Sequence, residues 1–402
     1  MRMSLRWSSI GALTTLVWVT ITLAIMLATL LAHHEHTVTH SYYDAARSWF
    51  HGADVYHLTD AAGRPSIHGF LYLPATAVLY GPLAALPFRW HELLWRLLAI
   101  GAFAYAIDRL YRVLGGSSAR SSLAPLITAV LAILPAVACM RNGQMNLMIA
   151  ACLTLGVVAL ADQGWWRATL WLALGFALKP TMLVPVLLAA AIYRPMRWRL
   201  LLGLIAVLLL PFAAQAPAFV LRQYHLFAQK TALSSRPGEA GGFADLFSLL
   251  RWAGWDLAER TQTMLRLAAA LGTLGLCLRA DRRYPRSGAA FAVLMLSTIY
   301  MMLFNSVRGL NTYLIPGVPV ALLAALWLCA APRAPTGWAL AVLIVCWMAS
   351  WDLAGRDTWL SPLLMLPLAL WIAAAIARGR GFWPQPAVQA SKTGHDQATA
   401  PD

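Results

Sequence analysis

The chain has 402 residues, of which 60% are hydrophobic and only 12% are charged, and its mean hydropathy is +0.63. A water-soluble domain has about 45–50% apolar and about 25% charged residues, so this composition excludes an ordinary soluble protein. The net charge of +15 lies in short arginine clusters between apolar runs. That distribution is typical of the cytoplasmic loops of a membrane protein and argues against a nucleic-acid-binding face.

Apolar runs recur along the chain and predict an all-α, polytopic transmembrane protein with about 12 spans. Backbone groups in lipid must pair internally, so we expect helices rather than strands. The first run follows two arginines and is too long for a signal-peptide core, so we interpret it as an uncleaved span. The predicted spans cover residues 9–32, 91–113, 122–140, 146–162, 165–178, 180–194, 197–215, 263–279, 288–304, 309–331, 335–351 and 359–378.

Residues 71–88 contain three prolines and make a poor continuous span, so we expect a re-entrant or juxtamembrane helix there. With a cytoplasmic N-terminus, this count places the arginine clusters in the cytoplasm, as the charge bias of membrane proteins requires. We therefore expect one transmembrane domain over residues 1–382, with outer loops at 33–75 and 216–262. The polar residues 383–402 are expected to form a disordered cytoplasmic tail.

The five cysteines lie within apolar runs and show no Cys-x-x-Cys spacing, so neither a disulfide framework nor a zinc site is predicted. The first outer loop is rich in His, Tyr and acidic residues. Its histidines have no second cluster with ligand spacing, so we predict no metal. Its acidic residues are candidate general bases or charge stabilisers, since a carboxylate near a substrate hydroxyl can take its proton. They are Glu35, Asp44, Asp54 and Asp60. The alternative is an ordinary solvated loop.

Three later turns carry polar residues on the same predicted face. The Asn-Gly turn at 142–146 offers Asn142, Gln144 and Asn146, although Asn-Gly is also a common turn signal without function. Lys179, one of only three lysines, lies within apolar sequence and suits a phosphate, or alternatively extends to the membrane surface. Arg308 is a candidate phosphate clamp or an ordinary loop arginine.

Several of these segments together resemble a known family. They are YYDAARSWFHGADVY at 42–56, FLYLP at 70–74, GPLAALP at 81–87, NGQMN at 142–146 and ALKPT at 177–181. In this order and spacing they resemble glycosyltransferase family 87, the polyprenol-phosphate-mannose-dependent α-mannosyltransferases of the GT-C superfamily. The likeness covers residues 40–200 well, and beyond that it rests mainly on hydropathy.

The resemblance implies a GT-C fold, a lipid-linked sugar donor and an inverting transfer assisted by an acid in the first outer loop. In the family this acid precedes the first Tyr by about four residues, where this chain has no acid, so Glu35 or Asp44 would serve instead. Taking the residues and the resemblance together, we expect substrate to be bound by Tyr42, Tyr72, Asn142, Gln144, Asn146, Lys179 and Arg308.

The function expected from the sequence is therefore transfer of a hexose such as mannose from a polyprenyl-phosphate donor to an extracytoplasmic glycan or lipid acceptor. The expected location is a bacterial plasma membrane, with both termini cytoplasmic and the site on the outer face. Apart from the lipid-linked co-substrate, no cofactor is predicted. The alternatives are a non-catalytic binder or transporter of a lipid-linked sugar, and a structural membrane subunit.

Overall fold

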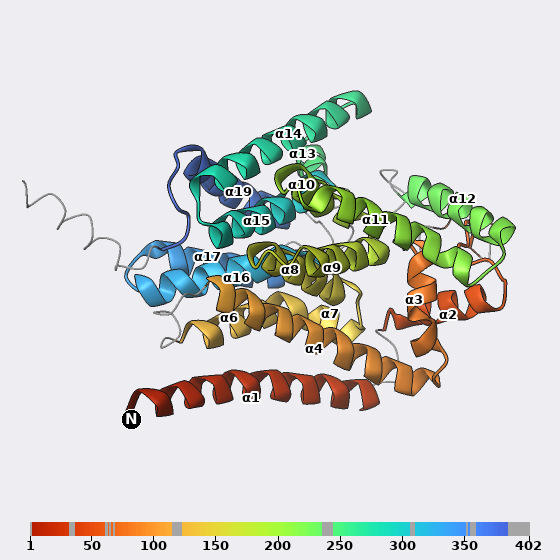
Figure 1. Cartoon of the computed structure of the whole chain (residues 1–402), viewed down its shortest axis with the longest axis horizontal. Helices are drawn as coiled ribbons and strands as arrows, with labels where there is room; N and C mark the ends of the chain where they lie inside the picture. The colour runs from red at the N-terminus through yellow and green to blue at the C-terminus, as the bar shows by residue number, and fades with distance from the viewer. Residues whose placement is uncertain are drawn as a thin grey trace, which may run out of the picture.

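The computed structural model describes residues 2–31, 37–60, 63, 66, 69–114, 123–234, 244–305, 310–350, 353 and 359–384. Within these ranges every regular element is a helix, which confirms the all-α prediction (Figure 1). The α-helices are α1 (Arg2–Leu31), α2 (Thr39–Phe50), α3 (Pro74–Ala84), α4 (Phe88–Leu114), α6 (Ala124–Ile133), α7 (Val137–Asn142), α8 (Asn146–Ala161), α9 (Trp165–Leu178), α10 (Leu183–Ile192), α11 (Met196–Leu209), α12 (Pro217–Ser234), α13 (Leu246–Trp252), α14 (Glu259–Arg283), α15 (Arg286–Phe304), α16 (Leu314–Ala330), α17 (Pro335–Met348) and α19 (Leu360–Ala377). Short 3-10 turns are η1 (Leu134–Ala136), η2 (Pro180–Met182), η3 (Leu210–Ala213) and η4 (Leu310–Tyr313).

Each of the twelve apolar ranges expected to span the membrane contains a helix. Seven helical stretches in the described chain are long and apolar enough to cross a bilayer, and three more are apolar but shorter. The protein is thus a polytopic membrane protein. The seven stretches are Ser9–Leu31, Ala124–Asn142, Met196–Ala213, Glu259–Arg283, Arg286–Phe304, Asn311–Ala330 and Leu360–Ala377.

The proline-rich stretch at 71–88 forms the short helix α3, as expected for a segment that does not span. Pro74 occupies its first turn, where a missing amide proton costs nothing. The helix packs against α2 and α4. Both predicted outer loops also contain helices that the apolar pattern did not indicate. They are α2 in the first loop, and α12 and α13 in the second.

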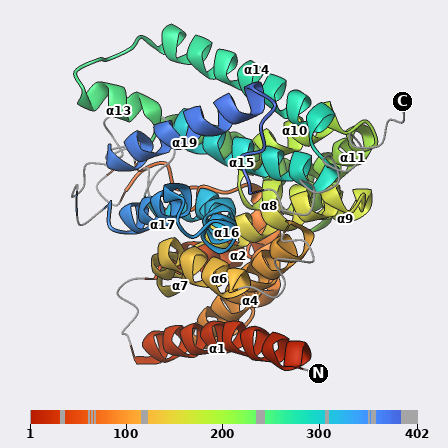
Figure 2. The same ribbon diagram turned by 90° about the vertical axis from the view of Figure 1, so that its left-hand side faces the viewer.

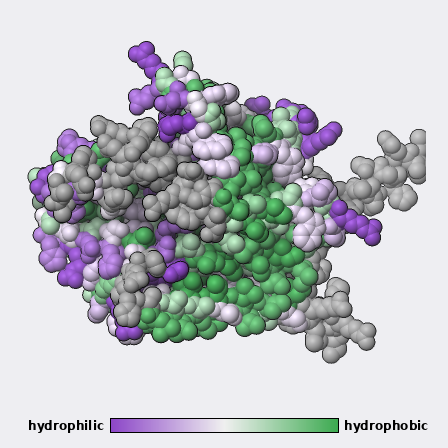
Figure 3. All heavy atoms as spheres, turned by 180° about the vertical axis from the view of Figure 1, so that it is seen from behind, coloured by the Kyte–Doolittle hydropathy of each residue, from purple (hydrophilic) through white to green (hydrophobic). Residues whose placement is uncertain are grey.

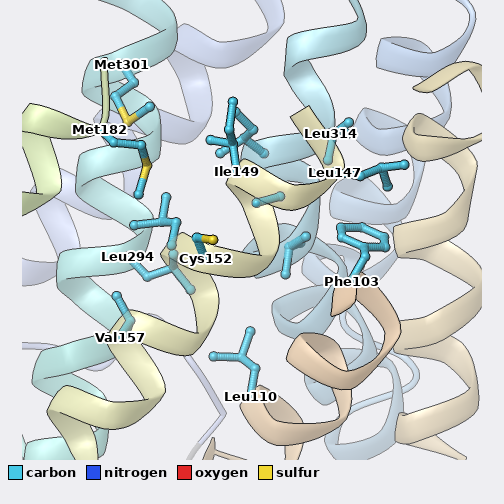
Figure 4. Packing of buried hydrophobic residues seen from close by; sticks show 14 of the residues in the cluster. Phe103, Leu110, Leu147, Ile149, Cys152, Val157, Met182, Leu294, Met301 and Leu314 are labelled. Atoms are coloured by element: carbon cyan, nitrogen blue, oxygen red, sulfur yellow. The ribbon is translucent and has the colours of Figure 1, made fainter. Parts of the chain in front are cut away.

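Helix α8 lies at the centre of the bundle, where it packs against α4, α9, α15 and α16. Figure 4 shows its side chains Leu147, Ile149 and Cys152 among residues of these neighbours, including Phe103 of α4 and Leu294 of α15. Nearly every residue of α8 is buried and apolar, which is the pattern typical of a helix surrounded by protein on all sides. Its N-terminus is therefore held rigidly in place.

The outer surface of the bundle is apolar over a broad area. In Figure 3 hydrophobic residues cover a continuous region between hydrophilic groups at opposite ends of the molecule. Helix α1 lies along one side of the bundle (Figures 1 and 2), and only 6% of its apolar window is buried. Its exposed leucines include Leu16, Leu23 and Leu27. Exposed apolar area on this scale is what a lipid environment requires.

Helix α12 of the second predicted outer loop packs against segments of the first at one end of the molecule, at the right in Figure 1. The buried Lys230 of α12 donates hydrogen bonds of 2.5 Å to the carbonyl oxygens of His57 and Ser66. Gln223 of α12 accepts a 3.1 Å hydrogen bond from the amide of Val55. These contacts hold α12 beside the segment that joins α2 to α3.

Candidate functional site

The turn between α7 and α8 brings the Asn-Gly motif into a fixed geometry. Helix α7 ends at Asn142, and Gly143 follows in the left-handed conformation with φ +65°. The amide of Gln144 then donates to the carbonyl of Cys139 at 2.9 Å, closing the helix end. A side chain at Gly143 would also collide with Thr39, whose methyl carbon would lie 2.5 Å from the added Cβ. Only glycine fits this turn.

The same turn is fixed by α4 and by the residues before α2. The indole nitrogen of Trp95 donates to the carbonyl of Gly143 at 2.8 Å. The amide of Val38 donates to the carbonyl of Asn142 at 3.0 Å. The start of α2 and the start of α8 therefore lie next to each other, although they are far apart in the sequence.

Tyr42 joins these two elements through its hydroxyl group. The hydroxyl accepts a 3.2 Å hydrogen bond from the amide of Met145 and lies 3.1 Å from the hydroxyl of Tyr72. Burial raises the pKa of both tyrosines above the ordinary value, because a phenolate would lose its solvation. Both hydroxyls therefore stay protonated and act as hydrogen-bonding groups rather than as bases.

Lys179 also reaches the start of α8. Helix α9 ends at Leu178, and Lys179 is extended with φ −156° and ψ 123° because Pro180 disfavours helix at the residue before it. The ammonium nitrogen lies 3.4 Å from the side-chain oxygen of Asn146, the first residue of α8. The end of α9 is tied to α3 by a 2.6 Å hydrogen bond from the hydroxyl of Thr76 to the carbonyl of Ala177.

These segments enclose a cavity of about 550 Å³. Five residues predicted to bind substrate line it, namely Tyr42, Tyr72, Gln144, Asn146 and Lys179. We call this cavity the polar pocket. The remaining described lining residues are Val38, Ser41, Gly69, Leu71, Pro180, Thr181, Phe227, Thr231, Ser234 and Asn305.

The other predicted site residues do not line the polar pocket. Asn142 contributes its backbone carbonyl to the turn and is not among the lining residues. Asp44 lies on the exposed side of α2, whereas Tyr42 on the same helix is buried. Glu35 and Arg308 lie outside the described residues.

Sequence reasoning missed the contribution of α12, which supplies Phe227, Thr231 and Ser234 to the polar pocket. The spacing of four residues between Phe227 and Thr231 places them on one helix face, a signal that was present in the sequence. The sequence did not show which segments this face of α12 would pack against. Asn305, at the end of α15, is the lining residue nearest in sequence to Arg308.

The electrostatics of the polar pocket favour an anion. Lys179 is the single charged residue among the described lining residues, and none of them is Asp or Glu. The first N–H groups of α8 have no acceptor within the helix and point out of its N-terminus, where the helix dipole also favours negative charge. A lysine beside a helix N-terminus and neutral amides is an arrangement that binds a phosphate group.

Two other grooves are present elsewhere. A groove of about 890 Å³ lies between α1 and α4, with Trp18, Leu97 and Gly101 in its wall. It extends to Asp108 and Arg112, at the end of α4 away from the turn that Trp95 contacts. A groove of about 630 Å³ lies between α2 and the end of α3. The polar pocket is the one that gathers the residues singled out from the sequence.

Fold and site together define a polytopic helical membrane protein. At one end of its bundle is a pocket lined by one lysine and by neutral side chains. Residues 70–304, more than half of the chain, match the model of glycosyltransferase family 87, and the chain belongs to this family. Family membership makes it a membrane glycosyltransferase. The matched range includes the Asn-Gly and Lys-Pro turns and extends well beyond residue 200, where the resemblance in sequence had rested mainly on hydropathy. No curated protein matches the chain.

Proposed function

We propose that the protein transfers a sugar from a polyprenyl-phosphate donor to an extracytoplasmic glycan or lipid acceptor. A hexose such as mannose is the proposed sugar, and the outer face of a bacterial plasma membrane is the proposed location. The observation that carries the proposal is the position of Lys179 beside Asn146 at the N-terminus of α8, within the polar pocket. A phosphate held there would receive a cation, neutral donors and the dipole of a buried helix.

In the proposed reaction the acceptor hydroxyl oxygen attacks the anomeric carbon of the donor sugar. A new carbon–oxygen bond forms as the bond between that carbon and the phosphate oxygen breaks. The hydroxyl proton passes to a base, and the polyprenyl phosphate leaves with the bonding electrons. Lys179 and the first amides of α8 stabilise the charge that develops on the leaving phosphate. Tyr42, Tyr72 and Gln144 offer hydrogen bonds that position the sugar.

Of the two candidate bases, we propose Glu35. Asp44 lies on the exposed side of α2, and its carboxylate is absent from the polar pocket. Val38 lines the pocket, and Glu35 is only three residues before it in the sequence.

A transfer assay with a radiolabelled polyprenyl-phosphate sugar tests this assignment. Glu35→Gln is expected to lower the transfer rate by about 100-fold, because general-base assistance contributes factors of 10² to 10⁴. Asp44→Asn is the matched control and is expected to keep the activity. Equal activity in both variants would remove Glu35 from the mechanism.

The alternative is a relative that binds or moves a lipid-linked sugar without transferring it. The observation that favours it is the absence of a carboxylate among the described lining residues of the polar pocket. Reconstituted vesicles separate the two. Product formation supports the transferase, whereas movement of the labelled lipid across the bilayer without product supports the alternative.

A further inference from the structure

Two walls of the polar pocket come from distant parts of the chain. One wall is the start of α2, which supplies Val38, Ser41 and Tyr42. The other is the turn before α8, which supplies Gln144 and Asn146. Behind these walls, and absent from the pocket lining, lies the guanidinium group of Arg96 on α4.

Arg96 bonds to both walls. Its Nε and Nη2 donate to the carbonyl oxygen of Arg141 at 3.2 and 2.9 Å, which fixes the turn before α8. Its Nη2 also donates to the hydroxyl of Thr37 at 3.1 Å, just before α2. One planar side chain thus connects the two segments that build the pocket.

Glu92, one helical turn before Arg96, completes the arrangement. Its Oε1 accepts from Arg96 Nη1 at 3.2 Å and from the hydroxyl of Thr39 at 3.0 Å. Glu92 and Arg96 are 1% and 3% exposed, so both charges are shielded from water. Ionised groups on a membrane helix are costly to bury, and this cost makes a functional role the first hypothesis.

We propose that Arg96 is a positioning residue for sugar transfer, which sets the spacing between the start of α2 and the start of α8, with Glu92 balancing its charge. This inference rests on the proposed function of the polar pocket. Arg96 does not touch the substrate and acts through the backbone at Arg141 and the hydroxyl of Thr37. Lysine cannot replace it fully, because a single ammonium lacks the fixed fork that reaches two acceptors in different directions.

Helix α4 also offers a matched control. Arg112 and Asp108 form an ion pair with the same spacing of four residues on the same helix, but they are 63% and 48% exposed. They lie at the other end of α4. An Asp108→Asn, Arg112→Met double variant removes a comparable pair without affecting either wall of the pocket.

The test compares Arg96→Met, Arg96→Lys and the double variant Glu92→Gln, Arg96→Met in the full chain. Arg96→Met is expected to lower kcat about 100-fold, the size of loss that small misplacements of reacting groups cause. Arg96→Lys should recover part of it. The double variant leaves no unpaired buried charge, so its Tm should return towards the wild-type value while kcat stays low. The Asp108→Asn, Arg112→Met control should keep the wild-type kcat and Tm.

Recovery of kcat together with Tm in the double variant would reduce Arg96 to a structural role and overturn the proposal. So would full activity of Arg96→Met, or an equal loss in the exposed control pair.

Hydrogen exchange supplies a readout that does not depend on activity. The amide of Val38 bonds to the carbonyl of Asn142 and reports whether the two walls remain together. Its exchange is expected to accelerate in Arg96→Met and in the Glu92, Arg96 double variant, but not in the control pair. Unchanged exchange would contradict the proposal. If exchange accelerates as expected but the wild-type protein transfers no sugar, Arg96 still holds the two walls together, but the proposed function fails and so does the role of Arg96 in transfer.

Discussion

Lys179 is placed by local chemistry rather than by a long-range signal. Pro180 prevents α9 from continuing, so Lys179 adopts an extended conformation at the helix end. From there its ammonium group meets Asn146, and no carboxylate lies among the described lining residues to neutralise it. A cation without an acidic partner in the same pocket is suited to an anionic substrate rather than to a structural ion pair.

Replacing Lys179 therefore tests the phosphate site at the scale of a single residue. Lys179→Met is expected to lower transfer from the polyprenyl-phosphate donor by about 100-fold, comparable to loss of one preorganised group at a developing charge. Lys179→Arg keeps the charge and should retain part of the activity. The measurement is the initial rate with radiolabelled donor.

The matched control is Lys392→Met. Lys392 is in the C-terminal segment, outside the described residues. It is expected to keep the wild-type rate. Full activity of Lys179→Met would remove the phosphate role.

At the scale of elements, the apolar pattern predicted the long helices well. Length and hydropathy identify a segment such as α15 without reference to the rest of the fold. The same pattern could not indicate α2, α12 or α13, because these helices are amphipathic or short and occupy polar stretches of sequence. Their helical state depends on the partners they pack against.

The candidate site shows the same division. The Asn-Gly and Lys-Pro turns could be located from the sequence, since each turn has a local signature in glycine or proline. Their meeting in one pocket depends on contacts between distant segments, such as Tyr42 with Met145 and Lys179 with Asn146. No local pattern contains that information. Asp44 illustrates the limit, because its place on the exposed side of α2 follows from packing alone.

Helix α13 carries a pH-dependent contribution to stability. Asp245 caps its N-terminus by accepting a 2.8 Å hydrogen bond from the amide of Ser248, and only 2% of the residue is exposed. Burial raises the pKa of Asp245, with the capping amide and nearby arginines opposing the shift. The folded protein therefore holds the proton more tightly than the unfolded chain. The stability that this adds is complete below the unfolded pKa of about 4 and is lost as the pH rises through the raised pKa.

Asp245→Asn should stay neutral while keeping an oxygen for the cap. Its Tm in detergent is expected to match that of the wild-type protein below pH about 4 and to exceed it at neutral pH. Asp245→Ala loses the cap and should be less stable by about 1 kcal/mol at acidic pH. The measured quantity is the Tm of Asp245→Asn minus the Tm of the wild-type protein. A smaller value at neutral pH than at acidic pH would contradict this account.

At the scale of the whole molecule, the central position of α8 connects fold to function. Its buried body is held by α4, α9, α15 and α16, while its N-terminus opens into the polar pocket. A rigid support of this kind suits a site that must hold a leaving phosphate in place. The apolar exterior in Figure 3 would face lipid, so a lipid-linked donor would not have to leave the membrane to reach the protein.

The proposed orientation can be tested with single cysteines in a background without the five native ones. Asp44→Cys and Arg282→Cys place reporters at two exposed positions. The first is on α2, whose start lines the polar pocket, and the second is in a basic cluster. A membrane-impermeant maleimide is expected to label the first in intact cells and the second only after permeabilisation, because arginine clusters favour the cytoplasm. The reverse pattern would place the pocket in the cytoplasm.

Photocrosslinking tests the central claim, donor binding in the polar pocket, most directly. A polyprenyl-phosphate sugar with a photoreactive group beside its phosphate would be bound, activated by light and mapped by mass spectrometry. We expect label in residues 142–146 and 177–181, competition by unlabelled donor and loss of label in Lys179→Met. Label confined to the groove between α1 and α4 and unaffected by Lys179→Met would show that the donor binds elsewhere.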